Sequence, residues 1–246
     1  LKDAGLAFSE DVPLAKRSYW RAGGPADGLC NVSNLNDLTS LVQICTRTNC
    51  PYFVLGNGSN EIIELLCHCF LNRERSLVAS EHAFVVYKLM ATLFGAKYVE
   101  AADSDFVHDL DAMADAITTD TRLVFIANPN NPTGTLVGQT EIDRFMNRLP
   151  DHVVTVFDEA YYEFLSDPPD TVKYVKEGRN VCILRTFSKA HGLAALRIGY
   201  GLASEPVADL LNRARQPFNA NAIAQADYGL EEICFELNME AARLAL

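Results

Sequence analysis

The chain has 246 residues, a length typical of one large domain or of one domain with appended segments. Its composition, 49% hydrophobic and 22% charged, excludes an intrinsically disordered or low-complexity protein. A net charge of −11 disfavours nucleic acid and anionic membrane surfaces as partners, so any anionic ligand needs local donors such as a helix N-terminus or one arginine.

The first 52 residues contain turn signals at Gly23-Gly24-Pro25 and Asn34-Leu35-Asn36, followed by a predicted helix over 36–48. This segment is too short to bury a hydrophobic core alone. The start, Leu1-Lys2-Asp3, lacks the residue order of a signal peptide, and no apolar run in the sequence reaches the length of a transmembrane helix. We therefore expect a cytoplasmic protein with no membrane partner.

From about residue 53 onward, apolar runs typical of strands alternate with stretches of helical periodicity. This alternation predicts an α/β fold with a mostly parallel sheet flanked by helices. The predicted strands are 76–80, 97–101, 122–127, 153–158, 181–187 and 197–203. The predicted helices are 60–71, 83–94, 109–118, 138–148 and 205–215. Residues from about 219 to 246 form one long helical pattern without recognisable chemistry.

Seven cysteines are scattered through the chain, an odd number that favours reduced thiols over a disulfide framework. Cys67-His68-Cys69 places three ligand-type residues together. In a predicted helix, however, side chains two residues apart point away from each other. Core packing is therefore the favoured interpretation, and we predict no metal site.

Four motifs lie at the carboxyl ends of predicted strands, where open α/β sheets place their ligand crevice. The first, GNGSNE at 56–61, leads into a helix whose first N–H groups could bind a phosphate. A plain helix cap explains this motif about equally well. The second, NPNNPTG at 128–134, directly follows an apolar strand, although such a segment in isolation is more typical of a turn.

The third motif begins with Asp158, which closes a buried strand. A carboxylate there is costly unless it meets a cation or a donor, so we expect it to contact a ligand. The fourth motif, RTFSKAHGL at 185–193, carries Lys189 between the hydroxyls of Thr186 and Ser188, with Arg197 eight residues further on. A surface lysine is the common alternative, but this neighbourhood favours ligand binding.

Together these motifs resemble the large domain of the fold type I pyridoxal-phosphate aminotransferases, and most closely the histidinol-phosphate aminotransferase family. The resemblance covers about residues 56–225. It includes, in the family's order, GNGSNEIIELL, EHAFVVY, NPNNPTG, DEAYYEF, RTFSKAHGLAALRIGY and RQPFN. It implies an enzyme of histidine biosynthesis that uses pyridoxal 5'-phosphate to transfer an amino group from histidinol phosphate, or another amino donor, to 2-oxoglutarate. It also implies a homodimer.

The resemblance also assigns roles to individual residues. Lys189 would hold the cofactor as a Schiff base and move the substrate proton, Asp158 would pair with the ring nitrogen, and Phe84 would stack on the ring. Asn131 and Tyr161 would bind the phenolic oxygen of the ring. The phosphate would be held by Ser59, Asn60, Thr186, Ser188 and Arg197. His82 and His191 are interpreted as structural.

The two ends of the chain depart from this family. Residues 9–60, with SYWRAGGPA at 18–26 and VLGNGSN at 54–60, resemble the start of UDP-N-acetylenolpyruvoylglucosamine reductase. The tail from Phe218 onward is similar to a stretch of cobalamin-dependent methionine synthase. These resemblances divide off a reductase-like segment at 1–55 and a helical tail of different origin at 226–246. The sequence therefore predicts a mosaic of three parts, with the aminotransferase-like domain at 56–225. The small domain that carries the family's substrate-carboxylate arginine is missing, so cofactor binding is better supported than turnover. Two alternatives remain open: a cofactor-binding but catalytically impaired mosaic, and a flavin-binding UDP-N-acetylmuramate dehydrogenase-like protein.

Overall fold

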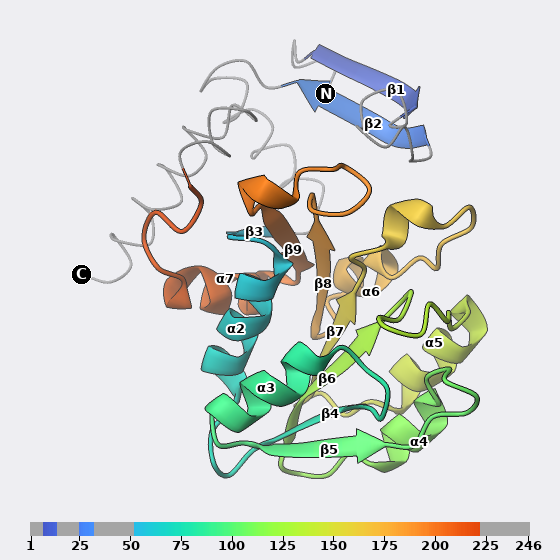
Figure 1. Ribbon diagram of the computed structural model, residues 1–246, viewed down its shortest axis with the longest axis vertical. Coiled ribbons are helices and arrows are strands. Elements are labelled where there is room, and N and C mark those ends of the chain that lie inside the picture. Colours follow the sequence, from blue (N-terminus) through green and yellow to red (C-terminus); the bar gives the residue numbers. More distant parts are fainter. Residues whose placement is uncertain (1–6, 14–24, 32–51, 222–246) are drawn as a thin grey trace.

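The computed structural model describes residues 7–13, 25–31 and 52–221 (Figure 1). Two strands, β1 (Ala7–Pro13) and β2 (Pro25–Asn31), pair antiparallel in a sheet of their own. The predicted helix at 36–48 and most of the helical pattern at 219–246 lie outside the described residues. Within the described residues, no helix combines the length and the apolar character needed to span a bilayer.

A seven-stranded sheet forms the centre of the structure, in the order β3-β9-β8-β7-β6-β4-β5. Its strands are β3 (Tyr52–Gly56), β4 (Ser76–Ser80), β5 (Lys97–Ala101), β6 (Thr121–Ala127), β7 (Val154–Asp158), β8 (Val181–Thr186) and β9 (Gly199–Ala203). The five strands β5, β4, β6, β7 and β8 run parallel. The β9 strand is antiparallel to both β8 and β3. The predicted α/β fold with a mostly parallel sheet is confirmed.

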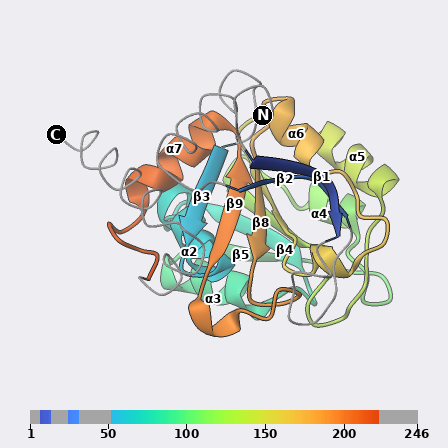
Figure 2. The same cartoon turned by 90° about the horizontal axis from the view of Figure 1, so that it is seen from above.

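Helices cover both faces of this sheet, giving three layers (Figures 1 and 2). One face is packed against α2 (Ser59–Phe70), α3 (Val85–Leu93) and α7 (Glu205–Ala214). The other is packed against α4 (Leu110–Asp115), α5 (Gln139–Arg148) and α6 (Val172–Lys176). Two short 3₁₀ helices, Tyr162–Phe164 and Ala194–Leu196, follow β7 and precede β9.

Side chains that alternate along each strand produce two hydrophobic cores, one on each face of the sheet. Within β6, Leu123 and Phe125 belong to the first core, whereas Val124 and Ile126 belong to the second. Successive side chains of a strand point to opposite faces, so an uninterrupted apolar run is what a strand covered on both faces requires. The helices supply matching apolar stripes, as in α5, where Ile142, Phe145 and Met146 are buried at helical spacing.

The sheet topology brings distant segments to one edge. The carboxyl ends of the parallel strands β6, β7 and β8 meet there because parallel strands finish on the same side. The antiparallel β9 begins at this edge, two residues after Arg197, and β3 ends there, shortly before α2. Four segments far apart in the sequence therefore converge: the start of α2, the loop after β6, the end of β7, and the connection from β8 to β9.

Candidate active site

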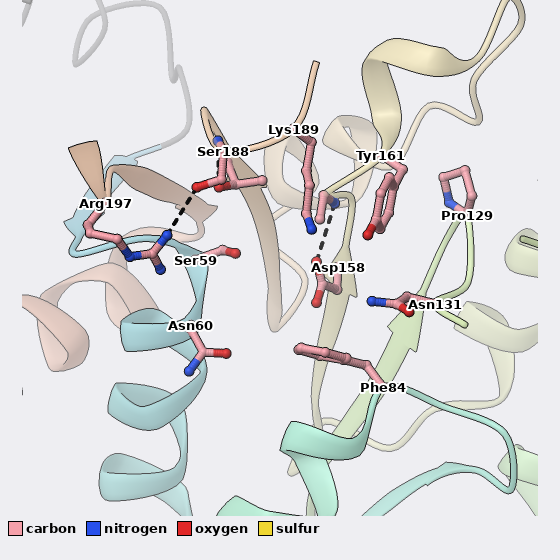
Figure 3. A pocket seen from close by; sticks show the side chains of 13 residues that line it. Ser59, Asn60, Phe84, Pro129, Asn131, Asp158, Tyr161, Ser188, Lys189 and Arg197 are labelled. Atoms are coloured by element: carbon pink, nitrogen blue, oxygen red, sulfur yellow. Dashed lines mark hydrogen bonds between the residues drawn. The ribbon is translucent and has the colours of Figure 1, made fainter. Parts of the chain in front are cut away.

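One cavity of about 190 Å³ lies at this edge (Figure 3). Ala127, Pro129 and Ala160 contribute to its wall. The structure brings together every residue that the sequence assigned to the site: the remaining lining residues are Ser59, Asn60, Phe84, Asn131, Asp158, Tyr161, Thr186, Ser188, Lys189 and Arg197.

Hydroxyl and cationic groups gather on one side of the cavity. In Figure 3, Arg197, Ser188 and Ser59 lie on this side, whereas Asn131 and Tyr161 lie opposite. The guanidinium of Arg197 donates from Nη1 to the hydroxyl of Ser188 at 3.3 Å and to the carbonyl of Ala194 at 3.1 Å. Ser59 is the first residue of the twelve-residue helix α2, whose N-terminus attracts anions. This side can therefore bind an anionic group despite the negative net charge of the chain.

Two glycines allow these groups to approach one another. Gly58 has a φ of +81°, and a Cβ there would lie 2.6 Å from Nη2 of Arg197. A Cβ on Gly199 would lie 2.5 Å from the backbone nitrogen of Ser59. Arg197 itself adopts a left-handed backbone with φ of +50°, a conformation that costs a non-glycine residue about 1 kcal/mol or more. Such strain in a residue that lines a cavity points to a functional role.

Asp158 lies between these two sides and is 6% exposed. Its Oδ2 accepts a hydrogen bond of 2.7 Å from the hydroxyl of Tyr87, and its Oδ1 accepts one of 3.3 Å from the backbone N–H of Ala160. Burial raises the pKa of the Asp158 carboxyl, whereas these two donors and the charge of Lys189 oppose the rise. In the part of the chain that the structure describes, no cation lies within 4.0 Å of this carboxylate. A positively charged group of a ligand would pair with Asp158 and offset the cost of burying its charge.

Lys189 extends into the cavity beside Asp158 (Figure 3). Its Nζ lies 5.1 Å from the centroid of the Tyr161 ring. Phe84, the residue immediately before α3, presents its ring below the carboxylate and supplies a flat apolar wall. The cavity therefore combines a primary amine, a buried carboxylate, a stacking surface and an anion-binding side.

Tyr87 and Asn130 also support the site, although neither was predicted as a site residue. Tyr87 is fully buried, and Asn130 donates from Nδ2 to the carbonyl of His82 and to the hydroxyl of Thr133, both at 2.8 Å. The hydrogen bond from Asn130 to His82 ties the loop after β6 to the segment that carries Phe84. A signal for Tyr87 did exist: it follows Phe84 by three residues in an apolar helix, and a buried tyrosine hydroxyl needs a polar partner.

The two histidines interpreted as structural do not line the cavity. His82 pairs with Asp103 at 2.6 Å and His191 with Glu163 at 3.4 Å. Glu81, His82 and Asp103 offer three potential ligand atoms within 4.8 Å of one another, without further indication of a metal.

Core packing is confirmed for Cys67 and Cys69 of the Cys67-His68-Cys69 segment but not for His68. Cys67 is a member of the first core, and burial followed by the charge of Glu64 raises the pKa of its thiol to about 12. Cys69 packs against the same core, whereas His68 is half exposed and pairs with Glu64.

Comparison with known proteins relates this arrangement to one family. A family model described as aminotransferase class I and II matches residues 35–228. A histidinol-phosphate aminotransferase of Akkermansia muciniphila is 59% identical over 173 residues, which cover 70% of this chain and 48% of that protein. Histidinol-phosphate aminotransferase 2 of Ralstonia nicotianae is 45% identical over 224 residues, covering 89% of this chain and 60% of that protein.

A solved structure has the same fold. The histidinol-phosphate aminotransferase of Sinorhizobium meliloti, in complex with pyridoxal-5'-phosphate, matches with a TM-score of 0.67 and 26% identity. The match covers 78% of this chain and 54% of that one. The chain thus spans about half the length of the relatives it matches.

The range of the family match differs from the predicted division of the chain. The family model extends beyond both expected boundaries, to residue 35 on one side and residue 228 on the other. In addition, residues 52–55 form β3 together with Gly56 and pair with β9 along its whole length. The resemblances to a reductase and to methionine synthase, and the mosaic they implied, are not borne out.

Proposed function

Because the chain belongs to the class I and II aminotransferase family, we propose that it binds pyridoxal 5'-phosphate and transfers an amino group from histidinol phosphate to 2-oxoglutarate. The observation that carries this proposal is the buried carboxylate of Asp158 beside the amine of Lys189 in one cavity. The similar Sinorhizobium meliloti enzyme, solved with this cofactor, supports it. The flavin-binding and catalytically impaired alternatives are not favoured by the similarity to aminotransferases.

The cavity fits this cofactor on chemical grounds. Asp158 is a desolvated carboxylate that forms no ion pair within 4.0 Å among the described residues, and a protonated ring nitrogen would supply one. The donors of Ser59, Thr186, Ser188 and Arg197 suit a phosphate dianion. Phe84 would cover one face of the ring, while Asn131 and Tyr161 would hold its phenolic oxygen. Asn60 would contribute to the phosphate site.

When bound, pyridoxal phosphate supplies an electron sink for negative charge at the α-carbon of the substrate. The Asp158 carboxylate would favour the proton on the ring nitrogen, because a carboxylate in a low-dielectric site attracts a cation strongly. Nζ of Lys189 would bind the cofactor covalently and, once released, would take the proton from the α-carbon. Arg197 and the start of α2 would fix the phosphate and with it the position of the ring.

Absorption spectroscopy tests the proposal. We expect a visible band when pyridoxal phosphate is added to the protein, loss of that band with borohydride, and no bound chromophore with FAD. Histidinol phosphate should bleach the band and 2-oxoglutarate should restore it. Lys189→Ala is the control, since it should remove the covalent band. A bound flavin spectrum without any pyridoxal phosphate band would refute the assignment.

We propose in addition that the protein is a cytoplasmic homodimer. The resemblance to the histidinol-phosphate aminotransferase family supports this proposal. Sedimentation equilibrium of the purified chain, whose monomer mass is 27.1 kDa, distinguishes a dimer from a monomer.

A further inference from the structure

A buried tyrosine outside the cavity lining contacts the carboxylate at the centre of the site. Tyr87 lies on α3 with 0% exposure, and its hydroxyl donates to Oδ2 of Asp158 at 2.7 Å. This is the shorter of the two hydrogen bonds to the carboxylate, since the backbone N–H of Ala160 lies 3.3 Å from Oδ1. The tyrosine is therefore the principal donor to Asp158 in the structure.

The tyrosine ring is held in place by two aromatic neighbours. It stacks on Phe125 with a centroid distance of 4.4 Å and an interplanar angle of 21°, and it meets Phe84 edge-on at 5.7 Å. Phe125 lies on β6 next to β7, which ends in Asp158. These contacts fix the position of the hydroxyl. Phe84 in the cavity wall and Tyr87, which binds the carboxylate, are three residues apart at the start of α3.

The hydrogen bond has an electrostatic consequence. A donor to a carboxylate stabilises its ionised form, and this matters most where water cannot do the same. Burial raises the pKa of the Tyr87 hydroxyl well above its ordinary value, with the neighbouring Asp158 charge adding to the effect. The hydroxyl therefore stays protonated and remains a hydrogen-bond donor at neutral and acidic pH.

We propose that Tyr87 is a positioning residue that keeps the Asp158 carboxylate ionised and fixed in the cavity, ready to meet the ring nitrogen of the cofactor. The role of Tyr87 toward the ring nitrogen rests on the function proposed above, whereas its effect on the Asp158 carboxylate does not. Tyr87→Phe removes the hydroxyl and keeps the ring, so packing against Phe125 is preserved. Without the hydrogen bond from Tyr87, the Asp158 carboxyl should take up a proton at a higher pH than in the unaltered protein.

The cofactor-free protein gives the first readout. Carbon-13 NMR of labelled aspartate side chains follows the Asp158 carboxyl, with Asp158→Asn identifying its signal. The protonation midpoint should rise by about one pH unit in Tyr87→Phe, as expected for losing a hydrogen bond to a charged group. Tyr174→Phe is the matched control, because Tyr174 is also buried and donates to a carboxylate, Asp143, on the other face of the sheet. An unchanged Asp158 midpoint in Tyr87→Phe would overturn the proposal.

The second readout is the pH profile of cofactor affinity, which a merely structural tyrosine would not move. The acidic limb of the profile should shift to higher pH in Tyr87→Phe by the same amount as the Asp158 midpoint. An analogue with carbon in place of the ring nitrogen should show no such shift, since it has no proton to share with Asp158. Equal shifts with both ligands would overturn the role toward the ring. Absence of cofactor binding to the unaltered protein would instead overturn the proposed function, while a moved midpoint would still support the hold on Asp158.

Discussion

Lys189 differs from Lys88 and Lys173 in its surroundings. Lys88 pairs with Glu100 and Lys173 with Asp143, both at 2.6 Å, whereas Lys189 extends into the cavity. We predict that borohydride reduction of the pyridoxal phosphate-loaded protein fixes the cofactor to Lys189 alone. Peptide mapping by mass spectrometry measures this, with Lys189→Arg as the control that retains the charge. A cofactor adduct found mainly on Lys88 or Lys173 would contradict the assignment.

His108 is a buried histidine with an incomplete set of partners. It is 6% exposed, its Nε2 donates to the carbonyl of Ala127 at 3.0 Å, and its Nδ1 is buried without a partner among the described residues. Burial lowers the pKa of this imidazole, and the contact with Ala127 and the charge of Asp103 only partly offset that effect. The folded protein therefore holds His108 neutral at a pH where the unfolded chain already takes up a proton.

His108 should make the protein less stable at acidic pH. As the pH falls below about 6.5, the unfolded state binds more protons than the folded state at this position, so stability decreases. One such group changes the free energy of unfolding by at most about 1.4 kcal/mol per pH unit. We expect His108→Gln to lose less stability than the unaltered protein between pH 7 and pH 5 in urea titrations. His68→Gln, at a half-exposed site, is the matched control. Parallel curves for the unaltered protein and His108→Gln would refute this prediction.

At the level of single residues, the sequence predicted the lining of the cavity but not the support behind it. Asp158, Thr186 and Arg197 could be placed because each adjoins an apolar strand, and parallel strands end at one edge. Tyr87 and Asn130 could not, because their partners lie 71 and 48 residues away in the sequence. Contacts at such distances depend on how α3 and the loop after β6 pack on the sheet.

At the level of elements, β7 and β8 are tied together by a buried ion pair. Glu159, directly after β7, accepts from Arg185 of β8 at 2.9 Å, with side-chain exposures of 3% and 16%. The guanidinium also lies 3.6 Å from the centroid of the Tyr162 ring, and Thr171 donates to the same carboxylate. This cluster fixes the strand ends on which Asp158 and Thr186 are placed.

Removing one partner of this pair should be costly, because it leaves the other charge buried. We predict that Glu159→Gln lowers the free energy of unfolding by about 3–5 kcal/mol in urea titrations. The matched control is Glu100→Gln, which breaks the exposed pair with Lys88 and should cost about 1 kcal/mol or less. Similar losses in both variants would show that burial does not govern the contribution of the Glu159 pair.

The predicted elements agree with the structure where the signal is local. The strands at 76–80 and 97–101 match β4 and β5, and the helix at 138–148 differs from α5 by one residue. The direction of β9 was not predicted, because a strand carries no local record of its partner's orientation. β3 was missed because its residues had been assigned to a separate segment, and the five residues of α6 are too few to show a helical period.

At the level of the whole molecule, the site exists only when the sheet is complete. Its lining residues come from α2, the segment before α3, the loop after β6, β7 and the connection between β8 and β9. An unfolded chain cannot assemble this set. Cofactor that binds the folded state alone must therefore stabilise the fold by mass action.

We predict that pyridoxal phosphate at about 100 times its Kd stabilises the protein by about 2.7 kcal/mol. For a chain of this size, this corresponds to a rise in Tm of roughly 5–10 °C, measurable by calorimetry. Pyridoxal at the same concentration, which lacks the phosphate, should raise Tm less, because it gains nothing from Arg197 and the start of α2. Arg197→Gln should reduce the difference between the two ligands, since it removes the charged donor on the anion-binding side. If pyridoxal and pyridoxal phosphate raised Tm equally in the unaltered protein, the converging strand ends would not form a phosphate site, and the negative net charge would then dominate over the local donors.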